Sequence, residues 1–291
     1  MKLILVPTDL SDIAELGLKL AIEIAKRSKA TIRLVNFMKH PLGKTFTATG
    51  DVSLKIDGEE QRFTLSLLHA NKERLEELVH QYAHEGVTIE FAFVDDNFKS
   101  GIDEYLKAHD IDLVVMGTSG EENAREAFVG NHTEQTIKTS TCPVLSVRDG
   151  FEIEHFKTIV VGVEVITDNQ VAGGLSFIQD LAACFESEIH LVHVRDNATD
   201  SNILLDEYFT QMAQIAQLRR FKVVILEAYD KMEGVIQYAR NVRAGLVAVL
   251  RNHRGGIFRM LSGHLSDRMV KEEGRPVFTV NLRNTEAAHD S

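Results

Sequence analysis

Cysteine is scarce in this chain, which has only two, Cys142 and Cys184, in 291 residues. Both lie in apolar sequence, and neither has a second cysteine at the spacing of a CxxC motif. This argues against a disulfide framework and against a cysteine-based metal site. We expect both residues to be buried, reduced thiols.

Long apolar runs are absent too. The opening run from Met1 to Val6 meets Pro7 and Asp9 too soon to form a signal peptide. No run reaches the roughly 20 apolar residues that a bilayer-spanning helix needs. The sequence therefore predicts a cytoplasmic protein with no membrane partner.

Basic residues are fewer than acidic residues. The chain has 32 lysines and arginines against 43 aspartates and glutamates, a formal net charge of −11. Nucleic acids and anionic membranes both attract basic surfaces, so neither is an expected partner. A hydrophobic content of 44% and a charged content of 26% are typical of a soluble globular chain, here long enough for one large domain or two.

Several catalytic and nucleotide-binding motifs are missing. There is no G-x-G-x-x-G, H-E-x-x-H or G-x-S-x-G. The run Gly43-Lys44-Thr45 resembles the end of a P-loop, but Met38 holds the position of the required earlier glycine. Twelve histidines lack metal-ligand spacing, and His190 and His193 fall on opposite faces of an expected strand, which favours structural roles. We therefore assign neither a catalytic residue nor a metal site.

The chain contains a long internal repeat. Five apolar segments of the first half recur in the second: 2–9 with 157–164, 32–37 with 189–194, 87–94 with 221–228, 112–116 with 246–250, and 142–147 with 275–280. Helical patterns separate the segments, as in βαβ units. The sequence thus predicts an α/β fold of two tandem domains, residues 1–149 and 150–291. Each is an open, Rossmann-like, five-stranded parallel sheet with helices on both faces.

The two halves differ by one insertion. The offset between repeats falls from 157 at the second segment to 134 at the third, which places about 23 extra residues between them in the first half. Residues 52–56 and 61–65 flank a turn-like run, so we expect a β-hairpin insertion over about 45–66. It would serve as a dimer element or a lid.

A glycine-rich stretch follows the fourth segment of the first half. Gly117 and Gly120 follow a buried apolar run, and Gly130 precedes a helical pattern. Such a loop and helix start suit a phosphate. Because the carboxyl ends of parallel strands share one edge, Asp9 would lie at that edge and accept hydrogen bonds from ribose hydroxyls. The alternative for Asp9 is an ordinary loop or capping aspartate.

These features resemble the universal stress protein family, in its tandem form. The resemblance rests on Pro7-Thr8-Asp9, the Val-Val-Met-Gly block at 114–117 and the Cys-Pro-Val-Leu-Ser-Val run at 142–147. The family motif is Gly, two residues, Gly, nine residues, then Gly-Ser or Gly-Thr; here Asn131 replaces the hydroxyl residue. The resemblance implies ATP or another adenine nucleotide, with any Mg²⁺ held by the phosphates. The implied nucleotide-binding residues are Pro7, Thr8, Asp9, Phe37 (through its backbone), Met116, Gly117, Gly120, Gly130, Asn131 and His132.

The second domain departs from this pattern. Arg251 and Arg254 stand where the first domain has Gly117 and Gly120, and Glu164 replaces Asp9. We expect a degenerate site there, and we interpret the first-domain glycines as a requirement of the ligand rather than of the fold. The alternative is a basic anion pocket. It would comprise Arg251, His253 and Arg254.

Three functions are compatible with these residues. The favoured one is a stress-response regulator that binds ATP in its first domain. The others are an interaction protein that binds no nucleotide, and a slow ATPase. We also expect the two fifth strands, 144–147 and 277–280, to pair within the chain, or with a second copy in a homodimer, because an open strand edge invites aggregation. The protein partner and the triggering stress are not specified by the sequence.

Overall fold

The structure is a computed structural model that describes residues 1–39, 47–50, 59–118, 131–166, 170–195, 201–251 and 275–282. It forms two compact units, Met1–Gly117 and Thr118–Ser291. Predicted strand 52–56 and the glycine loop 119–130 lie outside the described residues. The predicted domain boundary after residue 149 follows the sequence repeat and stays a prediction.

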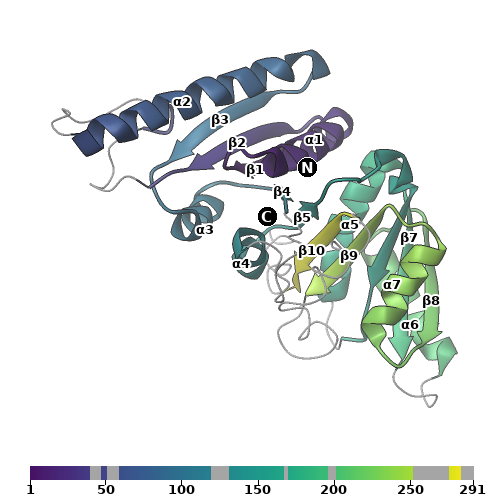
Figure 1. Ribbon diagram of the computed structural model, residues 1–291. Helices are drawn as coiled ribbons and strands as arrows, with labels where there is room; N and C mark the ends of the chain where they lie inside the picture. The colour runs from purple at the N-terminus through teal and green to yellow at the C-terminus, as the bar shows by residue number, and fades with distance from the viewer. Residues whose placement is uncertain are drawn as a thin grey trace. The chain divides into compact units, whose positions relative to one another are not determined.

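The first unit is a parallel sheet of the order β3-β2-β1-β4. Helix α1 packs on β1 and β4, α2 on β3, and α3 on β2 (Figure 1). The elements are β1 (Leu3–Thr8), α1 (Asp12–Ser28), β2 (Thr31–Phe37), α2 (Glu59–Gln81), a 3₁₀ turn (Ala83–Glu85), β3 (Ile89–Val94), α3 (Phe98–Ala108) and β4 (Leu113–Gly117).

The sequence of this unit explains its first strand and helix. Ile4, Leu5 and Val6 are fully buried, as the continuous apolar run of a strand covered on both faces requires. Ser11 then caps α1 by accepting a hydrogen bond from the Ala14 amide at 3.2 Å, as its sequence position predicts.

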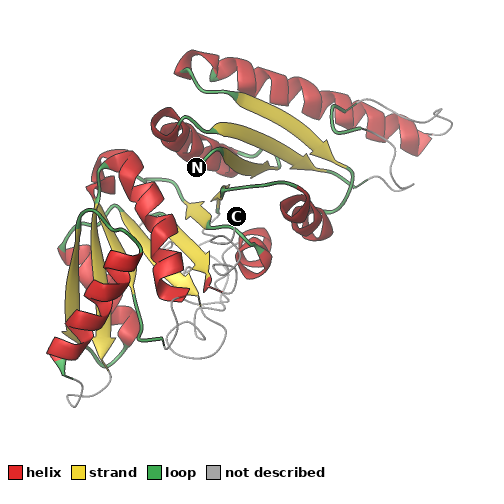
Figure 2. Ribbon diagram, turned by 180° about the vertical axis from the view of Figure 1, so that it is seen from behind, coloured by secondary structure: helices red, strands yellow, loops and turns green. Residues whose placement is uncertain are grey.

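The second unit is a sheet of the order β5-β10-β9-β6-β7-β8. Helices α5 and α6 contact each other on one face, and α7 packs on β6 and β7 from the other (Figures 1 and 2). The elements are α4 (Asn131–Thr139), β5 (Val144–Val147), a 3₁₀ turn (Ile153–Lys157), β6 (Thr158–Gly162), α5 (Gln170–Phe185), β7 (Glu188–Arg195), α6 (Asn202–Ile215), β8 (Phe221–Glu227), α7 (Lys231–Asn241), β9 (Leu246–Arg251) and β10 (Val277–Asn281).

The structure confirms the predicted α/β class with its mostly parallel sheet, but it overturns the hairpin. Residues 61–65, expected as the second hairpin strand, lie in α2, which begins at Glu59. Leu68, Leu75 and Tyr82 recur every seven residues, two helical turns, and all are buried. The helix marked by these residues continues upstream through 61–65, and the pair Glu59-Glu60 suits a helix start.

The cysteines match the expectation only in part. Neither forms a disulfide bond, but Cys142 is buried while Cys184 is only partly so. No helix in the described ranges has both the length and the apolar character that crossing a membrane requires.

Strand β10, the last strand of the second sequence repeat, lies next to β5, the last strand of the first. It pairs in parallel with β9 and antiparallel with β5, where Phe278 lies opposite Leu145. The Ser146 hydroxyl adds a hydrogen bond to the Val277 carbonyl at 3.3 Å. The predicted pairing of the two fifth strands within the chain is therefore confirmed, and it explains why α4 and β5 group with the second half.

Hydrogen exchange tests this pairing. We expect the β10 amides to exchange at the rate of global unfolding, because β10 is hydrogen-bonded on both sides, and those of β8 to exchange faster, because β8 pairs only with β7 among the described strands. The protection should not depend on protein concentration. If β10 exchanges as fast as β8, or is protected only at high concentration, the pairing within one chain is wrong.

Candidate functional site

The loop after β1 is a tight, hydrogen-bonded turn. The Thr8 hydroxyl accepts a hydrogen bond from the Leu10 amide at 3.0 Å, and Asp9 Oδ1 accepts from the Ser11 amide at 3.0 Å and the Ser11 hydroxyl at 2.5 Å. Leu10 has a φ of 65°, a left-handed conformation that costs a non-glycine residue about 1–2 kcal/mol. The turn thus holds Asp9 in one orientation at the expense of backbone strain.

One oxygen of Asp9 remains available. The residue is exposed, and Oδ2 has no hydrogen-bond partner among the residues that the structure describes, whereas Oδ1 is held by Ser11. An ionised carboxylate offers only acceptors, so Oδ2 is suited to hydroxyl or amide donors. Asp9 is therefore an ordinary loop aspartate that stabilises the turn, and it also has an oxygen available to bind a ligand.

A polar side chain of the second strand anchors this loop in each unit. Asn36 Nδ2 donates to the Thr8 carbonyl at 2.8 Å. In the second unit His193 Nδ1 lies 3.0 Å from the Val163 carbonyl, the equivalent atom in the repeat. Because a carbonyl only accepts, His193 carries its proton on Nδ1, and its role is structural, as expected.

The carboxyl edge of the first sheet brings together the site residues expected from β1, β2 and β4. Strand β1 pairs in parallel with both neighbours, so their carboxyl ends lie at one edge. Phe37 ends β2, and its ring packs against Phe98 and Tyr105 at centroid distances of 5.2 and 6.3 Å. Its side chain thus belongs to the α3 contact, while its backbone ends the strand. The residues placed at this edge are Pro7, Thr8, Asp9, Phe37, Met116 and Gly117.

The other predicted site residues are placed differently. Asn131 is the first residue of α4, in the second unit, and His132 follows as an exposed residue. Outside the described residues lie Gly120, Gly130, His253 and Arg254.

Gly117 is required by packing, which corrects our interpretation that the ligand alone demands it. A Cβ at Gly117 would lie 1.7 Å from the Ile13 carbonyl oxygen, and one at Gly17 would lie 2.8 Å from the Gly117 nitrogen. The start of α1 thus rests directly on the backbone at the end of β4. No side chain fits between them.

In the second unit, side chains separate the equivalent helix, α5, from the equivalent strand, β9. Gly174, the repeat equivalent of Gly17, faces Leu282 and Leu250, whose side-chain carbons would lie 2.7 and 2.8 Å from an added Cβ. Backbone does not meet backbone there. Arg251 is therefore tolerated at the position where the first unit needs a glycine.

The second unit's counterparts of Asp9 and Gly117 are both engaged. Glu164 is mostly buried and lies 3.6 Å from the Lys231 ammonium. Arg251 is only 8% exposed, and its Nη1 donates to the Ile137 carbonyl at 3.2 Å. No sequence pattern predicts the Arg251–Ile137 contact, because Ile137 is 114 residues away.

A buried histidine of the second unit has a polar partner on each ring nitrogen. His190 Nε2 lies 2.9 Å from Glu188 and Nδ1 lies 3.2 Å from the Tyr238 hydroxyl. Since a carboxylate only accepts, Nε2 carries the proton and Tyr238 donates to Nδ1. Burial lowers the pKa of His190, with Lys222 adding to the effect, and the hydrogen bond from His190 lowers the pKa of Glu188. The neutral imidazole is thus fully satisfied and serves the fold.

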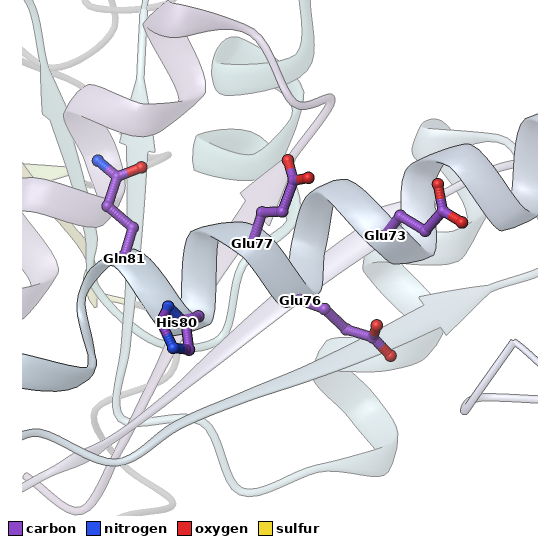
Figure 3. Close-up of a pocket in the computed structure, with 5 residues that line it drawn as sticks. All are labelled: Glu73, Glu76, Glu77, His80 and Gln81. Atoms are coloured by element: carbon purple, nitrogen blue, oxygen red, sulfur yellow. The ribbon is translucent and has the colours of Figure 1, made fainter.

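A shallow hollow of about 550 Å³ on α2 is a weaker candidate. Its lining comes from one helix, and Figure 3 shows Glu73 and Glu77 pointing to one side of that helix and Glu76 to the other. In the described part of the chain, no three His, Cys, Asp or Glu residues are grouped to hold a metal ion. The hollow lies near the end of α2 that leads into the amino end of β3, away from the carboxyl edge. Its lining residues are Glu73, Glu76, Glu77, His80 and Gln81.

Comparisons with known proteins identify relatives of this fold. The model of the Universal stress protein family matches residues 1–148. Universal stress protein MJ0531 of Methanocaldococcus jannaschii is 28% identical over 147 residues, which are 50% of this chain and 82% of the relative. Universal stress protein YxiE of Bacillus subtilis is 27% identical over 150 residues, 50% of this chain and 97% of the relative.

Solved structures match almost the whole chain. A universal stress protein from Archaeoglobus fulgidus superposes with a TM-score of 0.70 at 17% identity, over 96% of this chain and 98% of its own. A second, from Pseudomonas aeruginosa, gives a TM-score of 0.65 at 15% identity, over 99% of this chain and 97% of its own. At these identities the likeness concerns the fold.

Glycine substitutions separate the packing role of Gly117 from any ligand role. In nucleotide-free protein, Gly117→Ala should lower the free energy of unfolding in urea by about 2–3 kcal/mol, because the new methyl group overlaps the Ile13 carbonyl. The matched control is Gly162→Ala, also at a strand end. Its Cβ would lie 3.6 Å from Val235, and it should change stability by less than about 1 kcal/mol. Equal effects would contradict the packing role.

The pH dependence of stability tests the buried, neutral state of His190. The folded pKa of His190 lies below the ordinary value of 6.5, so the unfolded chain binds more protons as the pH falls through that value. Stability should therefore drop below about pH 6.5, by at most about 1.4 kcal/mol per pH unit for one proton. The loss from Glu188 comes at lower pH, below its unfolded value near 4.5.

A variant without the imidazole tests the assignment of this pH effect. His190→Gln should flatten the stability profile between about pH 6.5 and 5. Chemical denaturation of both proteins at a series of pH values measures the two slopes. Identical slopes in wild type and His190→Gln would show that another group titrates there.

Proposed function

The chain belongs to the universal stress protein family, and from this premise we propose that it binds an adenine nucleotide, ATP foremost, in its first half. We propose further that it acts as a regulatory protein of the stress response. Universal stress proteins have been solved in complex with dAMP and with cAMP. Those two chains align with less than half of this one, so the proposal rests on this chain's own residues.

The observation that carries the proposal is the arrangement of Asp9. Its Oδ1 is held by Ser11, its exposed Oδ2 has no hydrogen-bond partner in the described part of the chain, and the strained turn at Leu10 fixes the carboxylate at the carboxyl edge of the sheet. A fixed, solvent-facing acceptor is suited to the two hydroxyls of a ribose. The second unit lacks this feature, since Glu164 is mostly buried beside Lys231.

The remaining contacts are proposed from the motif. The adenine would meet the strand-end backbone at Phe37. The phosphates would meet main-chain N–H groups at Gly120 and Gly130 and those of the first turn of α4, at Asn131 and His132. Any Mg²⁺ would be held by the phosphates. An asparagine in the motif's hydroxyl position leaves these backbone donors intact.

The proposal contains no catalytic step. Binding and release of nucleotide would switch the affinity for a protein partner. The second half would hold no nucleotide, because the equivalents of Asp9 and Gly117 have protein partners. The cytoplasmic location expected from the sequence stays a prediction.

A first experiment asks whether any nucleotide binds. Purified protein is denatured, and released nucleotides are identified by mass spectrometry; the stripped protein is then titrated with ATP, AMP and adenosine by calorimetry. We expect adenine nucleotide to be released or rebound. If none is released, and millimolar ATP gives neither heat nor a thermal shift, the proposal fails and an interaction protein without nucleotide becomes the better description.

A second experiment tests the role of Asp9. Asp9→Asn keeps an oxygen for Ser11 but replaces the free acceptor with an amide donor, so AMP affinity should fall about tenfold to a hundredfold. With 2′,3′-dideoxy-AMP, variant and wild type should bind equally, because the hydroxyl donors are gone. The exposed neighbouring residue supplies the control, Asp12→Asn, which should bind both ligands normally. Equal losses for both ligands would remove Asp9 from the ribose contact.

A further inference from the structure

Two side chains at the ends of β9 and β10 hold the C-terminal end of α4. Arg251 Nη1 donates to the Ile137 carbonyl at 3.2 Å, and Asn281 Nδ2 donates to the same carbonyl at 2.8 Å and to the Ser140 carbonyl at 2.9 Å. Both carbonyls belong to the end of the helix, where main-chain acceptors lack partners within the helix. We name this pair, Arg251 and Asn281, the α4 clamp.

The two residues of the α4 clamp are buried and lie on adjacent paired strands. Arg251 and Asn281 are each 8% exposed and lie side by side, paired across β9 and β10. α4 packs on both β5 and β10 (Figure 1). A cation at the C-terminus of a helix also meets the negative end of its dipole. The clamp therefore combines directed hydrogen bonds with a favourable charge.

The amide of Asn281 is oriented by α4 alone. Its Nδ2 meets two carbonyls, while its Oδ1 is buried with no donor among the residues that the structure describes. The reverse orientation would place Oδ1 against two acceptors. Leaving the buried Oδ1 without a hydrogen bond costs free energy. We infer that the two hydrogen bonds from Nδ2 to the end of α4 outweigh that cost.

We propose that the α4 clamp is a positioning device for phosphate binding: by holding the C-terminal end of α4, it sets how well the N-terminal amides of that helix bind the phosphates of a nucleotide. The inference rests on the proposed function, which assigns phosphates to the opposite end of α4. The helix has nine residues, about 13 Å, and behaves as a short rigid rod. Fixing its C-terminal turn fixes where its N-terminal amides point. Arg251 and Asn281 touch no ligand; they act through the helix.

This role also explains why an arginine, Arg251, stands in the second repeat at the position that Gly117 occupies in the first. The first unit has Gly117 at the position of Arg251, and there the close approach of α1 excludes any side chain. The second repeat, with side chains between α5 and β9, has room for a long donor. Its strand ends thus serve the helix of the preceding repeat.

The test compares ligands with and without phosphate in the full chain. Arg251→Met removes the guanidinium donors, and Asn281→Leu replaces the amide with an apolar group of similar shape. Each should weaken ATP binding about tenfold while leaving adenosine binding within about twofold of wild type. Arg251→Lys keeps the charge and one donor and should recover part of the ATP affinity. The control is Arg219→Met, an exposed arginine, which should bind both ligands as wild type does.

The outcomes distinguish this inference from the proposed function. Wild type that binds ATP, with clamp variants that match it, overturns the clamp and leaves the proposed function standing. Equal loss of adenosine and ATP, without recovery in Arg251→Lys, shows a general folding defect and also overturns it. If Arg251→Met does not fold, Asn281→Leu alone decides by the same comparison. Wild type that binds neither ligand overturns both.

Discussion

The structure depends on strand β10 being hydrogen-bonded along both edges. Its parallel pairing with β9 completes the second repeat, and its antiparallel pairing with β5 draws in the last strand of the first. A strand edge left open would expose unpaired main-chain groups, so this single pairing removes two such edges. It also carries α4 into the second unit, where its C-terminal end meets Arg251 and Asn281. The proposed role of the α4 clamp follows from that pairing.

The two repeats share the hydrogen bond that anchors their first loop, but the loops differ in the carboxylate that they present. Asn36 and His193 both donate to the carbonyl that ends the first strand, so each unit fixes its first loop in the same way. The loops then diverge. In the first unit Asp9 faces solvent with an unengaged oxygen, whereas Glu164 in the second is mostly buried beside Lys231. A shared fold therefore does not entail a shared site, because the ligand-facing groups occupy positions that the fold leaves free to vary.

Prediction from sequence succeeded where the signal is local. Continuous apolar runs marked the strands, Ser11 marked the start of α1, and the repeat indicated which strands end each half. It failed at α2, because residues 61–65 alone read equally well as a strand, and the deciding period of Leu68, Leu75 and Tyr82 lies downstream. It also misread Gly117, whose partner is the Ile13 carbonyl, about a hundred residues earlier in the chain.

The sequence by itself determined the α/β class, the tandem repeat and the residues that could meet a nucleotide, because apolar period, turn chemistry and motif spacing are properties of short segments. Only the tertiary structure decided what those residues face. It showed that Gly117 serves packing as well as the proposed site, that Asp9 has one committed and one available oxygen, and that Arg251 is turned to a helix end. These outcomes depend on distances between remote segments, which are set by strand register and helix packing and leave no local trace in the chain.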